Sequence, residues 1–105
     1  MLNFHLHVFF DPADPEPART VAAGLREATG ANITSWWDRP GGPLPQAQFQ
    51  VELSSPDLGS VIEWLMLHRA GLSVLVHPET GDDLLDHTAH AVWLGTPLEL
   101  RLDRL

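Results

Sequence analysis

Apolar and polar residues alternate along two stretches of the chain, the pattern of strands with one buried face. In residues 2–10 one face carries Phe4, Leu6, Val8 and Phe10, and the other carries His5, His7 and Phe9. In residues 48–53 one face carries Phe49, Val51 and Leu53, and the other carries Gln48, Gln50 and Glu52. The pattern therefore predicts two half-buried strands. Shorter apolar runs at 33–37 and 72–77 indicate two further strands.

Helical spacing of apolar residues separates these strands in two places. Residues 17–29 are rich in Ala, Leu, Arg and Glu, and Gly30 is expected to end that helix. A second helix is expected from Ser55 to Gly71, with Ser55 as N-cap and Pro56 at the first helical position. Its predicted buried stripe consists of Leu58, Val61, Ile62, Leu65 and Met66.

The predicted order is strand, helix, strand, strand, helix, strand. This order is that of an α+β fold, the ferredoxin-like βαββαβ sandwich, in which both helices cover one face of an antiparallel sheet. A C-terminal extension is expected to add a short helical turn at 84–90 and a final strand at 98–102, where leucines alternate with charged residues. No linker or repeat divides residues 1–105, so one domain is expected.

Histidines on this fold indicate a candidate metal site. His5 and His7 project from one face of a strand, about 7 Å apart given the rise of a strand. In the ferredoxin-like topology the fourth strand lies antiparallel to the first, which brings His77 close to both. Imidazoles that converge in this way can hold a transition metal. The alternative is that these polar side chains only lie on a solvent-exposed face of the sheet and bind nothing.

The other histidines carry weaker signals. His87 and His90 are three residues apart and meet on one face if their segment is helical. His68 lies in the last turn of the second predicted helix, where the helix dipole favours a partial positive charge, so a structural role is expected.

Composition excludes several classes of function. Fourteen acidic residues against six arginines give a net charge of −8, which disfavours binding to nucleic acid or to an anionic membrane. The chain has no Cys, Lys or Tyr, which excludes disulfides, thiolate nucleophiles and Schiff bases. Neither a phosphate-binding glycine motif nor a GxSxG elbow occurs. The start lacks the basic residues of a signal peptide, and no apolar run is long enough to span a membrane, so a cytoplasmic protein is expected.

Several motifs together resemble the DOPA 4,5-dioxygenase family. They are the HxH strand in residues 4–9, the turn VHPETGD at 76–82, the segment DHTAHA at 86–91, and WLG at 93–95. The resemblance spans nearly the whole chain. It implies an extradiol dioxygenase that cleaves a catechol such as DOPA with O₂ and a non-haem Fe(II).

The placement of individual residues suggests roles in the chemistry that the resemblance implies. Imidazole ligation of Fe(II) would come from His5, His7 and His77, and His87 and His90 would act as catalytic bases. Two residues beside the proline-rich turn, Trp37 and Arg39, are candidates for substrate binding, with the Arg39 guanidinium pairing with a carboxylate.

Two positions depart from the family pattern. The family turn reads Gly-Pro-His-Pro, whereas this chain has Leu44 at the histidine position, and Trp37 stands where many members have another histidine. A non-catalytic or altered relative that binds a metal or aromatic ligand in the same pocket is therefore the alternative function. A third possibility is a ferredoxin-like dimerisation module. Phe9 and the tryptophans on the uncovered face lead us to expect a homodimer.

Overall fold

A five-stranded antiparallel sheet with the order β2-β3-β1-β4-β5 forms the centre of the computed structural model, which describes all 105 residues. The strands are β1 (Asn3–Phe10), β2 (Asn32–Trp37), β3 (Ala47–Ser54), β4 (Val74–Pro78) and β5 (Val92–Leu94). The first four strands have the ferredoxin-like order, and β5 extends the sheet beside β4. The predicted α+β sandwich is confirmed.

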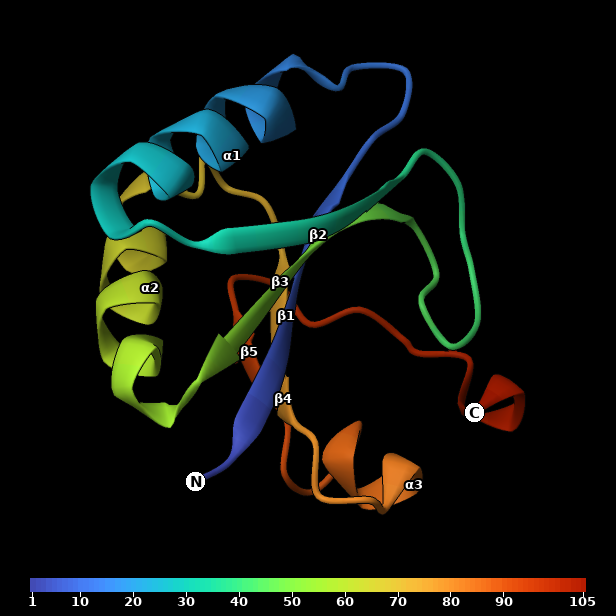
Figure 1. Ribbon diagram of the computed structural model, residues 1–105. Coiled ribbons are helices and arrows are strands. Elements are labelled where there is room, and N and C mark those ends of the chain that lie inside the picture. The colour runs from blue at the N-terminus through green and yellow to red at the C-terminus, as the bar shows by residue number, and fades with distance from the viewer.

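The two long helices, α1 (Glu16–Thr29) and α2 (Ser55–His68), lie on the same side of the sheet (Figure 1). Between them and the sheet lies a core that includes Leu6, Val51 and Leu25, each fully buried. The alternation in β1 and β3 therefore determines which face packs under the helices. Neither these helices nor any other is long and apolar enough to cross a membrane.

Details of the helices differ from the expected ones. Helix α2 begins at Ser55, whose hydroxyl donates to the Leu2 carbonyl instead of capping the helix. It ends at His68 because the backbone of Ala70 and Gly71 adopts positive φ angles. Met66 is 57% exposed and is not part of the buried stripe.

The segment after β4 differs most from expectation. It forms a short helix α3 (Asp83–Asp86), the strand β5 and a 3₁₀ turn η1 (Leu102–Arg104). No strand forms at 98–102; the leucines there alternate because Leu98 and Leu100 are half-buried in an irregular segment. Figure 1 shows α3 and the C-terminal segment on the side of the sheet away from α1 and α2.

Residues after β4 cover part of the sheet face that was expected to be open. Phe9 is 2% exposed, and its ring stacks on Trp93 of β5 at a centroid distance of 5.9 Å. His7 and Gln48 on the same face are also buried. Phe9 is therefore covered by a residue of the same chain and does not support a dimer interface. The homodimer stays a prediction.

Candidate metal centre

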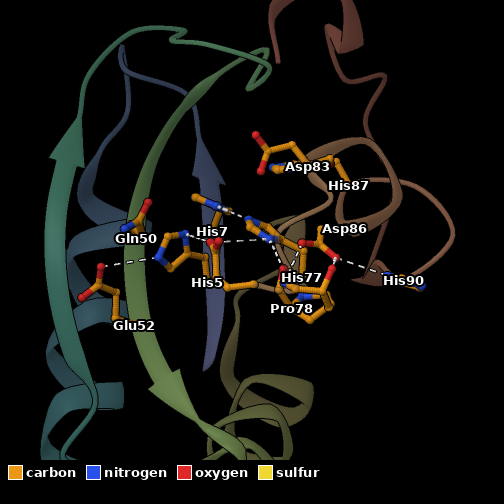
Figure 2. A network of polar contacts seen from close by, with 12 residues as sticks. His5, His7, Gln50, Glu52, His77, Pro78, Asp83, Asp86, His87 and His90 are labelled. Carbon is orange, nitrogen blue, oxygen red and sulfur yellow. Dashed lines mark hydrogen bonds and ion pairs between the residues drawn. The ribbon is translucent and has the colours of Figure 1, made fainter. Parts of the chain in front are cut away.

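Strand pairing brings three histidines together on this second face of the sheet. In the β1–β4 register His5 lies directly opposite His77, and His7 lies two positions further along β1. Each of the three offers one ligand atom, and these atoms lie within 4.8 Å of one another (Figure 2). Residues 70 positions apart in the chain thus share one cluster.

Two of the imidazoles are fixed by hydrogen bonds at their outer nitrogens. His7 Nδ1–H donates to Gln48 Oε1 at 2.9 Å, and His77 Nδ1–H donates to the Pro78 carbonyl at 3.1 Å. A neutral imidazole that carries its proton on Nδ1 has a free lone pair on Nε2. Both free Nε2 atoms point at each other, 3.2 Å apart.

Burial keeps these two rings neutral. Loss of solvent lowers the pKa of His7 from 6.5 to about 3, even though the hydrogen bond to Gln48 acts in the opposite direction. Loss of solvent likewise lowers the pKa of His77 to about 4, against the hydrogen bond to Pro78. Two neutral rings with facing lone pairs cannot hydrogen-bond to each other, so a cation between them would remove their repulsion.

The spacing of the two nitrogens fits a transition metal. Metal–imidazole bonds of about 2.1 Å at angles between 90° and 110° place two ligand nitrogens about 3.0–3.4 Å apart. The Nε2–Nε2 distance of 3.2 Å lies within that range. Hydrogen bonds from the far ring nitrogen to a carbonyl or amide oxygen are also typical of metal-binding histidines.

His5 has different surroundings from the other two. Its Nδ1 lies 2.6 Å from Glu79 Oε1, and its Nε2 lies 3.4 Å from Glu52 Oε1. The same Glu79 oxygen is 4.0 Å from His77 Nδ1. The cluster therefore has carboxylates beside it that can orient an imidazole or themselves bind a metal.

Glu79 and Gln48 were not predicted as part of the site. Glu79 follows His77 by two residues, and residues two apart at the end of a strand point to the same face of the sheet. This spacing is the sequence signal that could have indicated Glu79. Gln48 was assigned to the correct face, and its role as the partner of His7 emerges only from the β1–β3 pairing.

The two histidines after β4 occupy different positions. The His87 ring lies 4.1 Å from the His77 ring, centroid to centroid, and its Nδ1–H donates to the Asp83 carbonyl at 2.7 Å. His90 instead contacts Asp86 and is exposed on the side away from His5 and His7 (Figure 2). The structure thus brings His87 to the cluster and leaves His90 outside it.

Asp86 fixes the position of α3 beside β4. It accepts hydrogen bonds from the Thr80 backbone N–H at 2.8 Å and hydroxyl at 2.6 Å, and a third from His90. Burial raises the pKa of Asp86, but these hydrogen bonds outweigh it and lower the pKa to about 2. His90 therefore belongs to the anchor of α3, which in turn holds His87.

A pocket of about 310 Å³ opens onto the cluster. The residues that line it include the three clustered histidines and His87, together with Leu44, Gln50, Glu79, Asp83 and Arg104. A second hollow of about 480 Å³ shares His5 and Glu79 with this pocket and is otherwise lined by Asn3, Phe4, Glu52 and Leu53. His5 thus borders two solvent-accessible spaces.

The two residues expected to bind substrate lie at different distances from this pocket. Trp37 lines a neighbouring hollow of about 150 Å³ that shares Leu44 and Gln50 with the histidine pocket. Arg39 is exposed in the bend after β2 and lines neither space. The arginine beside the histidines is Arg104, which the sequence pattern did not indicate.

The family model for the Dopa 4,5-dioxygenase family matches residues 4–104. This chain belongs to that family. The resemblance seen in the HxH, VHPETGD and DHTAHA motifs is thereby confirmed, and the face that carries them is the face described above.

Among the proteins similar to this chain are two curated proteins and one of known structure. A 21.2 kDa uncharacterized protein of Botryotinia fuckeliana is 44% identical over 94% of the chain, and a DOPA 4,5-dioxygenase of Amanita muscaria is 36% identical over 98%. The chain covers 61% and 49% of the length of these two curated relatives. A crystal structure from Nostoc punctiforme, described provisionally as a dioxygenase, has a TM-score of 0.92 at 41% identity, covering 98% of this chain and 90% of that one.

Proposed function

We propose that this protein is an Fe(II)-dependent extradiol dioxygenase that cleaves a catechol. The observation that carries the proposal is the pair of facing, unprotonated Nε2 atoms of His7 and His77 at the floor of a pocket, in a chain of the dioxygenase family. His7, His77 and His5 would hold the iron. When bound, Fe(II) supplies adjacent coordination positions for the catechol oxygens and O₂.

The residues around the cluster prepare it for this role. Gln48 and Pro78 hold the imidazoles of His7 and His77 in the tautomer that leaves Nε2 free, so binding a cation requires no proton release from them. Glu79 accepts from His5 Nδ1 and orients that ring. Burial of His7 and His77 limits the access of water to the same point.

His87 is the proposed proton acceptor. Because its Nδ1–H donates to the Asp83 carbonyl, its Nε2 carries a free lone pair. The ring lines the pocket next to His77, where it can accept a proton from a catechol hydroxyl. Deprotonation of the catechol by a positioned imidazole is the general-base step that such a reaction needs.

Leu44 gives the alternative function specific support. It lines the pocket beside the histidines, at the position where the family pattern has a histidine. An apolar side chain there can neither bind a metal nor transfer a proton. A relative that binds a metal or an aromatic ligand without turnover is therefore the second candidate.

Anaerobic reconstitution with Fe(II), followed by a panel of catechols and then air, tests the proposal. We expect oxygen uptake and a yellow ring-cleavage product from the wild type, neither from His77→Ala, and both from the matched control His68→Gln, an exposed histidine at the end of α2. Calorimetry with Fe(II) or Mn(II) on the same proteins measures metal binding separately. Metal binding without oxygen uptake would support the alternative, and binding of neither a metal nor a catechol would contradict both.

A further inference from the structure

We propose that Arg104 is the residue that selects substrates carrying a carboxylate, a role that rests on the proposed function. Arg104 lies in η1 and lines the histidine pocket from the side of the C-terminal segment. It is the only arginine among the residues that line this pocket. The proposed ligand is a catechol whose side chain ends in a carboxylate.

The position of Arg104 is set by the backbone. The Arg101 N–H donates to the Pro43 carbonyl at 2.8 Å, which ties the C-terminal segment to the loop that carries Leu44. The Arg104 N–H then donates to the Arg101 carbonyl at 3.0 Å and closes the turn. In Figure 1 the C-terminal turn lies on the same side of the molecule as the loop between β2 and β3. Residues from two distant parts of the chain thus share one wall of the pocket.

The guanidinium has no partner within the protein. No carboxylate forms an ion pair with Arg104, although acidic residues outnumber arginines fourteen to six. Arg19 is the one arginine that pairs with a carboxylate, so Arg104 differs from the other unpaired arginines by its place at the histidine pocket. An unpaired planar guanidinium at a pocket is suited to bind a carboxylate through two parallel hydrogen bonds.

The charge of the pocket explains why such a residue is needed. Glu79 and Asp83 line the same pocket, and the protein carries a net charge of −8. The iron proposed above would offset the charge of the catechol oxygens, but a carboxylate at the far end of the ligand would still be repelled by this field unless a second cation lay beside it. Arg104 supplies that cation, while Leu44 offers an apolar surface to the ring or its side chain.

Anaerobic calorimetry on the Fe(II)-loaded protein tests the role of Arg104. The probes are 3,4-dihydroxyphenylacetate and 4-methylcatechol, which share the catechol ring and differ by the carboxylate. We expect Arg104→Gln to weaken binding of the carboxylate probe about 10- to 100-fold and to leave 4-methylcatechol unchanged. Arg104→Lys should restore part of the loss, because it keeps the charge without the planar fork. Arg26→Gln, an exposed arginine of α1, is the matched control.

Other results would overturn the inference. Equal losses for both probes in Arg104→Gln would indicate a structural role, and a selective loss in Arg39→Gln instead would assign the carboxylate to the other arginine. Because binding is measured without O₂, a selective effect of Arg104 without any turnover would contradict the proposed function alone. If the protein turns over both probes and Arg104→Gln has the same KM values as the wild type, the inference alone is contradicted.

Discussion

Acidification of the metal-free protein from pH 7 to pH 5 should lower its stability through His7 and His77. Both rings are buried and have pKa values of about 3 and about 4, against 6.5 for a histidine in water. Below pH 6.5 the unfolded chain binds protons at these positions and the folded chain does not. Their contribution to stability is therefore complete above pH 6.5 and is lost progressively as the pH falls toward their folded pKa values.

The size of this loss in stability follows from the distance, in pH units, between the pH and the histidine pKa of the unfolded chain. At pH 5 that distance is about 1.5 units, and each unit corresponds to about 1.4 kcal/mol, so His7 alone accounts for about 2 kcal/mol. His77 adds up to a similar amount, which gives a total of about 2–4 kcal/mol. This is a large part of the 5–15 kcal/mol that is typical of a small domain.

Urea unfolding at several pH values, followed by tryptophan fluorescence in the presence of a chelator, measures this loss. His7→Gln should remove about half of the pH dependence, whereas His68→Gln should leave it unchanged, because His68 is exposed. In an NMR titration the ring protons of His7 and His77 should not shift between pH 8 and pH 5. A stability that does not change between pH 7 and pH 5, or titration of these rings near pH 6.5, would refute the reasoning.

Two further predictions concern helix packing and the metal centre. A Cβ at Gly24 would lie 2.8 Å from the Trp64 ring, so Gly24→Ala should destabilise the fold by about 1 kcal/mol or more in thermal unfolding, whereas Gly59→Ala, with open space around it, should be neutral or stabilising. The opposite order of the two variants would show that α1 and α2 do not approach closely at Gly24. Gln48→Leu removes the partner of His7 Nδ1 and should weaken Mn(II) binding about 10- to 100-fold in calorimetry, and an unchanged affinity would exclude His7 as a ligand held by Gln48.

Local patterns in the sequence determined the sheet and the face on which the histidines lie. Alternation in β1 decides that Leu6 packs under the helices and that His5 and His7 lie on the other face, since successive side chains of a strand point in opposite directions. The order of the elements then predicts the ferredoxin-like pairing of β1 with β4, which puts His77 opposite His5. These inferences needed only periodicity and the known connectivity of one fold.

Only the tertiary structure decided how the segment after β4 contributes. The leucines at 98–102 alternate as they would in a strand, yet the segment is irregular and the added strand forms at Val92–Leu94 instead. The spacing of apolar residues shows which side of a segment is buried, but it does not show which other segment packs against that side. The same limit explains why Phe9 was expected on an open face: Trp93, which covers it, is 84 positions away.

The tertiary structure also decided which of several similar residues reach the site. His87 and His90 are indistinguishable by spacing, but the hydrogen bonds of Asp86 to Thr80 orient α3 so that His87 reaches His77 and His90 does not. Arg104 replaces Arg39 beside the pocket because the C-terminal segment folds back onto the Pro43 carbonyl. The sequence by itself determined the strands and the face that carry the imidazoles. The long-range contacts determined which loops complete the pocket, because they depend on packing between segments that no local pattern encodes.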